Sequence, residues 1–284
     1  MLTDSLGIGE WGFAAWVEVD GQTILFDTGA RPDTVWRNAQ ELKIDLSSAT
    51  QVILSHNHGD HTGGLLTLRR EAAKSNPKAL SESYVADGAF LSRQGLDGVE
   101  RNHLRNIQAD YQSLGGRFTV ISKPHQLLPS VWLTAGVPRK YPEKNWSTRV
   151  PLIRPNGDRA EDNLPEDSSM VIDTAKGLVV LSGCGHAGII NTLTYAKQIF
   201  PGRPIHAAIG GWHLFDASDD HLAWTASKLK ELGVENFLGA HCTGMEAVYR
   251  IRQLAGLTRR TCASGAVGGG FTLETGLIPG TIAR

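Results

Sequence analysis

Three histidines and an aspartate follow one short apolar segment of the chain. Gln51–Leu54 is apolar and β-branched, which predicts a buried strand, and His56, His58, Asp60 and His61 come directly after it. Burying this many imidazole and carboxylate groups is costly unless a partner offsets the cost. A pair of divalent cations is the partner that these residue types indicate.

The spacing of these four residues predicts two ligand positions. His56 and His58 are two residues apart in an extended segment, so both side chains point to one side and reach one cation at roughly 2.0–2.1 Å. Gly59 allows a sharp turn that directs Asp60 and His61 to a second position. One loop thus provides half of a two-metal site, and the remaining ligands must come from later in the chain.

Composition narrows the class of protein. The chain has 284 residues, 41% of them hydrophobic, and a net charge of −1, which predicts a globular protein without the basic excess of a nucleic-acid-binding protein. It contains no apolar run of about 18 residues, which a membrane span requires. Met1–Glu10 lacks a charged region followed by an apolar core, so no signal peptide is expected there. Three widely spaced cysteines form no disulfide framework, so a reducing, cytoplasmic location is expected. A homo-oligomer is compatible with these features.

Strands and helices are expected in alternation along the first half. Two strands, Phe13–Val19 and Gln22–Phe26, flank an Asp20-Gly21 turn, and a helix at Pro32–Lys43 has Asp33 as its cap. Further elements are expected as helices at Thr62–Arg70, Gly88–Arg93 and Asn102–Leu114, and as strands at Tyr84–Ala86, Arg117–Ile121 and Val131–Thr134. Arg139–Asp167 has no clear period and is expected to be a long loop.

The second half repeats this outline. Strands are expected at Ser168–Asp173, Gly177–Ser182, Ile205–Ile209 and Asn236–Gly239, and helices at Ile189–Phe200, Ser218–Leu232 and Met245–Leu254. Two β-rich halves with outer helices predict an α+β fold, an αβ/βα four-layer sandwich. Its two mixed, mostly antiparallel β-sheets lie face to face, with the metals at one edge between them.

Several motifs resemble those of one family. His56-Asn57-His58-Gly59-Asp60-His61 is similar to the signature of the metallo-β-lactamase fold superfamily. Within it, the chain most resembles the branch of the 7,8-dihydropterin-6-methyl-4-(β-D-ribofuranosyl)aminobenzene-5'-phosphate synthase-like enzymes. The segments that carry this resemblance are Leu25-Phe26-Asp27-Thr28-Gly29, Gly183-Cys184-Gly185-His186-Ala187-Gly188, Gly210-Gly211-Trp212-His213-Leu214 and His241-Cys242-Thr243-Gly244.

The resemblance implies a domain organisation and an N-terminal difference. It implies one domain over residues 1–284, with a specificity insert at about 76–165 lying over the metal site. The family usually begins with one further strand, for which only Met1–Glu10 is available here. The natural chain could therefore begin upstream with an export signal, as an alternative to the cytoplasmic location.

The resemblance also implies further site residues. Asp27 matches a buried acidic residue that braces the metal loop, and His241 matches the last histidine ligand, at the second metal. Many members place an Asp that bridges both metals after the strand Gly177–Ser182; here either Cys184 or His186 takes that place. We favour His186, since flanking glycines free the loop to turn it inward.

Other positions leave alternatives open. A histidine of many members is missing, and Glu166 and Asp167 occupy its place; Asp167 is a ligand, a partner of a ligand or a loop cap. His213 is a proton donor or a substrate contact. Arg139 either clamps a phosphate or carboxylate of the substrate or pairs with Glu143. The remaining histidines and cysteines are expected to be structural: His103, His125, His206, His221, Cys242 and Cys262. Cys242 is expected to point away from the site.

Together these residues predict a binuclear metal-dependent hydrolase. Two Zn²⁺ ions are expected, with Mn²⁺ or Fe²⁺ as alternatives. A metal-bound hydroxide would attack a small ester, lactone, amide or phosphoester, with Asp60 orienting it and His213 assisting the leaving group. The alternatives are a pterin-branch synthase or transferase on an anionic, phosphorylated small molecule, with β-lactam hydrolysis as a side activity. A protein that keeps the fold without turnover is disfavoured, because a degenerate member would be free to lose His56, His58, Asp60 and His61.

Overall fold

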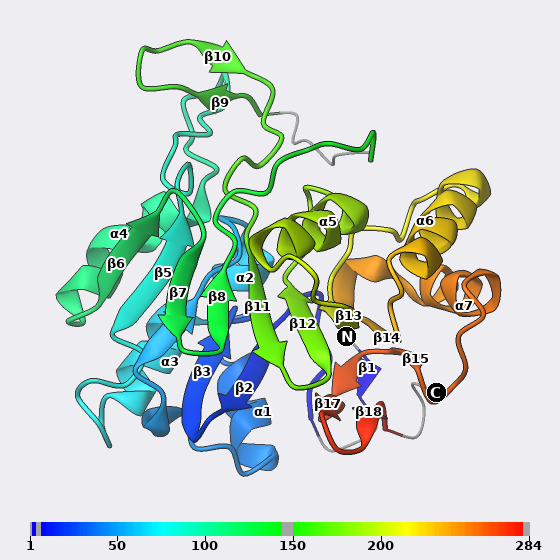
Figure 1. Ribbon diagram of the computed structural model, residues 1–284. Helices are drawn as coiled ribbons and strands as arrows, with labels where there is room; N and C mark the ends of the chain where they lie inside the picture. The colour runs from blue at the N-terminus through cyan, green and yellow to red at the C-terminus, as the bar shows by residue number, and fades with distance from the viewer. Residues whose placement is uncertain (1, 4–6, 144–149, 281–284) are drawn as a thin grey trace.

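The computed structural model, which describes residues 2–3, 7–143 and 150–280, contains two large β-sheets. The first has the strand order β2-β3-β4-β5-β6 and the second β15-β14-β13-β12-β11-β8-β7 (Figure 1). The first sheet comprises β2 (Ala15–Val19), β3 (Gln22–Phe26), β4 (Gln51–Ile53), β5 (Glu82–Ala86) and β6 (Arg117–Ile121). The second comprises β7 (His125–Leu128), β8 (Val131–Leu133), β11 (Ser169–Thr174), β12 (Gly177–Ser182), β13 (Ile205–Gly210), β14 (Asn236–Gly239) and β15 (Cys262–Ser264).

Helices cover the outer face of each sheet. The segments that connect the strands of the first sheet form α1 (Thr34–Glu41), the 3₁₀ helix η1 (Leu46–Ser48), α2 (Gly59–Thr62), α3 (Leu65–Ala72) and α4 (His103–Ser113). The second sheet has α5 (Ile189–Ile199), α6 (Asp219–Glu231), η2 (His241–Thr243) and α7 (Met245–Leu254) (Figure 1). No described helix combines the length and the apolar character needed to cross a membrane.

Three apolar clusters separate the four layers: one between the two sheets and one between each sheet and its helices. Alternation along β3 places Ile24 and Phe26 between the sheets and Leu25 against the helices of the first sheet. Alternation along β12 likewise directs Val180 to the helices and Leu181 to the inter-sheet core. The predicted αβ/βα sandwich is therefore confirmed.

The direction of the strands differs from the prediction. The pairs β3–β4, β4–β5 and β5–β6 are parallel, and so are β12–β13, β13–β14 and β14–β15. The expectation of mostly antiparallel sheets was wrong, because helices connect most of these strands and such crossovers join parallel neighbours.

The expected helix Thr62–Arg70 is two helices. The chain breaks at Gly63 and Gly64, where a Cβ atom would lie 2.0 Å from the carbonyl oxygen of Ala30 and 2.3 Å from that of Thr28, respectively. Only glycine permits this close packing of the segment after β4 on the segment after β3. The Asp33 side chain makes no cap hydrogen bond to α1, and it pairs with Arg37 instead.

The predicted insert contributes to both sheets. Residues 76–165 provide β5 and β6 to one sheet and β7 and β8 to the other, while β9 (Leu152–Ile153) and β10 (Arg159–Ala160) form a hairpin that extends from the layers (Figure 1). Residues 144–149 of the expected long loop lie outside the described part. Gly88–Arg93 forms turns and a bridge between Ser92 and Ile153, so the helix expected there was wrong.

Four of the strands that were not predicted form two small sheets near the chain ends. β1 (Leu2–Thr3) pairs with β16 (Ala266–Val267), and β17 (Gly270–Thr272) pairs with β18 (Gly276–Ile278). Each has two or three residues, too few for an alternation pattern to be recognised.

Candidate metal centre

The candidate site lies where strands of both sheets end. Asp27 follows β3, the segment from His56 to His61 follows β4, Cys184 and His186 follow β12, His213 follows β13, and His241 follows β14. β3 and β4 run parallel, as do β12, β13 and β14, so their carboxyl ends meet at one edge. In open sheets with such connections, this edge is where ligands bind.

Asp27 braces the loop after β4. Its Oδ1 accepts a hydrogen bond from the backbone N–H of Ser55 at 2.8 Å, and its Oδ2 accepts one from the Ser55 hydroxyl at 2.8 Å. Oδ2 also lies 2.6 Å from Nδ1 of His61. Burial lowers the pKa of His61, but the Asp27 carboxylate outweighs burial and raises this pKa to about 9. The contact directs Nε2 of His61 toward the centre, as the resemblance implied.

His56, His58 and His186 form a group of three imidazoles. Their nitrogen atoms lie within 4.8 Å of one another. Burial lowers the pKa of His56 and His186 well below the usual value and that of His58 to about 4, which leaves these rings neutral. Within the described part of the chain, the buried Nε2 of His56 has no hydrogen-bond partner. Neutral imidazoles around an unpaired buried nitrogen are a donor set that suits a divalent cation.

Asp60, His61 and His241 form the second group. Nε2 of His241 lies 3.2 Å from Oδ2 of Asp60 and 3.2 Å from Nε2 of His61. Burial opposes ionisation of Asp60, but the hydrogen bond with His241 and the charge of His61 hold its pKa well below the usual range. An ionised carboxylate beside two imidazoles also fits a cation.

Cys184 lies between the two groups. Its Sγ is 3.1 Å from Nε2 of His61, and its sulfur and the nitrogens of His56 and His61 all lie within 4.8 Å of one another. The structure thus separates the two candidates for the bridging place. His186 joins the three-imidazole group, and Cys184, rather than the favoured His186, occupies the position between the groups.

Cys242 does not point away from the site. Its Sγ lies 3.2 Å from that of Cys184 and accepts a hydrogen bond from the backbone N–H of His213 at 3.3 Å. Cys184, His213 and Cys242 form a further group of donors within 4.8 Å. The expectation that Cys242 faces the core was wrong, because His241 and Cys242 belong to η2 rather than to an extended strand. Successive side chains in a 3₁₀ helix do not alternate between opposite faces.

Three of these residues hold a left-handed backbone. The φ angles are 57° at Asp27, 47° at His213 and 49° at His241. Non-glycine residues rarely adopt this conformation, and it concentrates at functional sites where the surrounding structure enforces it.

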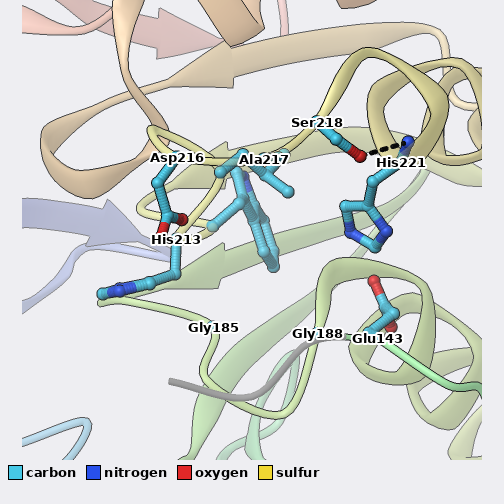
Figure 2. A pocket seen from close by; sticks show the side chains of 10 residues that line it. Glu143, Gly185, Gly188, His213, Asp216, Ala217, Ser218 and His221 are labelled. Atoms are coloured by element: carbon cyan, nitrogen blue, oxygen red, sulfur yellow. Dashed lines mark hydrogen bonds between the residues drawn. The ribbon is translucent and has the colours of Figure 1, made fainter. Parts of the chain in front are cut away.

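A cavity of about 290 Å³ adjoins the centre. Figure 2 shows His213 and Asp216 on one side and His221 and Glu143 on the other. The ring of His213 also approaches that of His186, with centroids 4.6 Å apart, so it connects the cavity to the three-imidazole group. His221, interpreted from the sequence as structural, lies on the wall of this cavity.

Glu143 carries the largest pKa change among the cavity residues. Burial raises its pKa from 4.5 to about 7. The N–H groups of Ile190 and Asn191 donate to the carboxylate and lower this pKa, but burial is the larger effect. The folded state then holds this proton more tightly than the unfolded chain. The resulting stability is fully present below pH 4.5 and is lost as the pH rises through 7.

Glu143→Gln should remove this pH dependence. Between pH 6 and pH 8 the wild-type chain should lose about 1.4 kcal/mol of unfolding free energy through Glu143. Urea unfolding of the metal-free protein at both pH values measures the difference. Glu231→Gln, at an exposed position, is the control and should keep the wild-type slope. An unchanged slope in Glu143→Gln would contradict the assignment.

Arg139 binds backbone carbonyl groups. Its guanidinium donates to the carbonyl oxygens of Asn163, Leu164 and His186. Arg139 thus links the loop before β11 to the loop that carries His186. Glu143, its alternative partner, instead accepts hydrogen bonds from the start of α5.

Asp167 contacts the same loop. Its Oδ2 accepts a hydrogen bond from the N–H of Ala187 at 2.8 Å, and burial raises its pKa to about 6. This contact holds the backbone of the loop that carries His186, and Asp167 belongs to none of the donor groups among the described residues.

An ion network behind the metal loop was not predicted. Arg93 lies 2.8 Å from Asp162 and 2.8 Å from Glu166, with all three side chains at most 2% exposed. Glu166 in turn accepts a hydrogen bond at 2.5 Å from Asn57, which lies between His56 and His58 in the chain. The ion pairs of Arg93 could not be predicted from the sequence, because its acidic partners lie about 70 residues away in the chain.

Arg93→Met should destabilise the protein strongly. It leaves two buried carboxylates without their cation, which costs roughly 3–5 kcal/mol. Urea unfolding of the metal-free protein measures the loss. Arg101→Met is a matched control, because Arg101 pairs with Asp97 at about half exposure and such pairs contribute about 0–1 kcal/mol. Equal losses in both variants would refute the network.

The other singled-out residues belong to none of the donor groups found in the described part of the chain. His103 contacts the Thr62 hydroxyl, His125 stacks on Tyr84, and His206 pairs with Glu235. Cys262 is buried in the core cluster of the second sheet.

Comparison with known proteins assigns the family. The model of the metallo-beta-lactamase superfamily matches residues 12–241. The chain belongs to this superfamily.

One relative matches the branch predicted from the motifs, and two solved structures share the fold. A 7,8-dihydropterin-6-methyl-4-(beta-D-ribofuranosyl)-aminobenzene-5'-phosphate synthase from Methanocaldococcus jannaschii is 32% identical over 242 residues, covering 81% of this chain and 79% of the relative. The crystal structure of Tm1679, described as a metal-dependent hydrolase of the beta-lactamase superfamily, is 30% identical with a TM-score of 0.71, over 89% of each chain. YhfI from Bacillus subtilis is 13% identical with a TM-score of 0.52, covers 89% of this chain and 88% of its own, and shares the fold.

Proposed function

We propose that this chain is a metal-dependent hydrolase that cleaves a small ester, lactone, amide or phosphoester. The observation that carries this proposal is the pair of three-donor groups at one sheet edge, joined to a cavity through His213. Tm1679, which is described as a metal-dependent hydrolase, supports it.

The donor groups would hold two cations. His56, His58 and His186 would hold one, and Asp60, His61 and His241 the other, with Cys184 between them. Zn²⁺ suits this set, and Mn²⁺ and Fe²⁺ are the alternatives. When bound, the cations would supply Lewis-acid activation of water and of the bond to be cleaved.

The chain's own groups then orient the reactants and transfer protons. Asp60 stays ionised and reaches the surface, with 23% of its side chain exposed, so it can accept a hydrogen bond from the attacking water. His213, between the centre and the cavity, can donate a proton to the leaving group. The cavity would hold the rest of a small substrate.

A synthase is the second candidate. The relative from Methanocaldococcus jannaschii is named for a product that joins a dihydropterin to a ribofuranosyl-aminobenzene phosphate. The same centre would then act on a phosphorylated substrate, for which Arg139 would have to exchange its backbone carbonyl partners for the phosphate.

Turnover by metal-loaded protein tests both candidates. Apoprotein is reconstituted with Zn²⁺, Mn²⁺ or Fe²⁺ and assayed with lactone, carboxylic ester, amide, phosphoester and β-lactam substrates. A parallel assay supplies ribofuranosyl-aminobenzene phosphate and a dihydropterin with an activated 6-methyl group. Metal-dependent hydrolysis of one class supports the hydrolase, whereas coupling alone supports the synthase. Full metal loading without either reaction contradicts the enzyme assignment.

A further inference from the structure

Two thiols meet beside the centre without forming a disulfide. Cys184 and Cys242 are 2% and 1% exposed, and their sulfur atoms lie 3.2 Å apart. Cys242 belongs to neither of the two proposed metal groups, and these groups do not explain why the two sulfur atoms lie so close together.

Adjacent parallel strands bring these thiols together with His213. Ser182 of β12, Gly210 of β13 and Gly239 of β14 are aligned, and Cys184, His213 and Cys242 follow these three positions. Gly211 makes this approach possible, since a Cβ atom there would lie 1.9 Å from the carbonyl oxygen of Gly183 and 3.0 Å from Sγ of Cys242.

The surroundings of the two sulfurs are polar. Nε2 of His61 is 3.1 Å from Cys184, and the backbone N–H of His213 is 3.3 Å from Cys242. Cys262 differs: it packs in the apolar cluster of the second sheet, with the carbonyl oxygen of Val248 at 3.6 Å from its sulfur. A role limited to core packing explains Cys262 but does not explain the polar contacts of the pair.

We propose that Cys184, Cys242 and His213 form a sulfur-rich position for a thiophilic divalent cation, separate from the group of Asp60, His61 and His241. Their donor atoms lie within 4.8 Å of one another. Thiolates select softer cations such as Zn²⁺, Co²⁺ or Cd²⁺, whereas the carboxylate of the other group suits Mn²⁺. The centre therefore offers two alternative second positions, and the identity of the cation decides between them. This inference rests on the proposed metal binding and adds selectivity to it.

Metal titrations of the apoprotein under reducing conditions test the position. Co²⁺ bound to thiolates gives a near-ultraviolet charge-transfer absorption, and Cd²⁺ and Mn²⁺ affinities follow from competition with chelators. Cys242→Ser should lose at least half of the charge-transfer intensity per cobalt and at least tenfold in Cd²⁺ affinity. Its Mn²⁺ affinity should change less than twofold. Cys262→Ser, the matched control at a buried thiol outside the group, should behave as the wild type.

The reciprocal variant keeps the test decisive if Cys242→Ser folds poorly. Asp60→Asn should lower Mn²⁺ affinity at least tenfold and leave the charge-transfer band in place. An unchanged band in folded Cys242→Ser, or equal losses of Mn²⁺ and Cd²⁺ affinity in Asp60→Asn, overturns the proposal. These readouts do not depend on turnover, so a protein that binds Co²⁺ through thiolate but hydrolyses nothing would contradict the proposed function alone.

Discussion

His58→Ala should remove most of the metal and abolish turnover. His58 is one of three neutral imidazoles in the first donor group, and two nitrogens hold a divalent cation far more weakly than three. Even partners of ligands are worth about 10–100-fold in metal affinity, so loss of a ligand should cost at least about 100-fold. Elemental analysis after dialysis and competition with a chromophoric chelator measure the loss, and turnover is followed with the substrate identified in the panel.

Two other histidines provide the controls for His58→Ala. His125→Ala removes an imidazole of β7 that stacks on Tyr84 of β5, and it should leave metal content and turnover at wild-type values. His221→Ala should keep the metal, and because His221 lies on the cavity wall, its effect should appear in KM. Wild-type metal content in His58→Ala would refute the ligand assignment.

The local part of the site could be predicted because it depends on local geometry. His56, His58, Asp60 and His61 occupy one loop, and their spacing alone directs two side chains to each of two positions. Which of Cys184 and His186 lies between the two donor groups could not be predicted in this way. The answer depends on the turn at Gly185, whose φ angle is 59°.

Contacts between distant segments account for most of what the sequence did not reveal. Cys242 meets Cys184 only because β12 and β14 flank β13, and strand order is not visible in an apolar pattern. The ion network of Arg93 joins two segments about 70 residues apart. The four-layer architecture was predictable, because the alternation of apolar residues along strands such as β3 and β12 shows which layer each side chain faces. The same alternation does not show in which direction a strand runs.

Asp27 connects the fold to the chemistry of the centre. It follows β3 with a left-handed backbone, and its side chain is fully buried against the loop after β4. Its two oxygens accept from Ser55 and contact Nδ1 of His61. A carboxylate can only accept hydrogen bonds, so His61 must carry a proton on Nδ1, and the lone pair of neutral His61 is then on Nε2, toward Asp60 and His241.

Asp27→Asn should therefore weaken the second metal position by inverting this arrangement. An asparagine whose oxygen still accepts from the Ser55 N–H presents its NH₂ group to Nδ1 of His61. Nδ1 must then accept, the proton moves to Nε2, and the nitrogen that faces the centre has no lone pair for a cation. We expect a fall of about 10–100-fold in affinity for the second equivalent of metal.

The same substitution should also destabilise the metal-free protein, by about 3 kcal/mol, because His61 is protonated there and the buried imidazolium loses its counter-ion. Calorimetric titration resolves the two metal equivalents, and urea unfolding gives the stability. Asp33→Asn, at an exposed aspartate paired with Arg37, is the matched control and should change neither quantity by more than the about 0–1 kcal/mol of a surface pair. If Asp27→Asn lowered stability while both equivalents kept wild-type affinity, Asp27 would be a structural residue only, and the orientation of His61 would have to come from another contact.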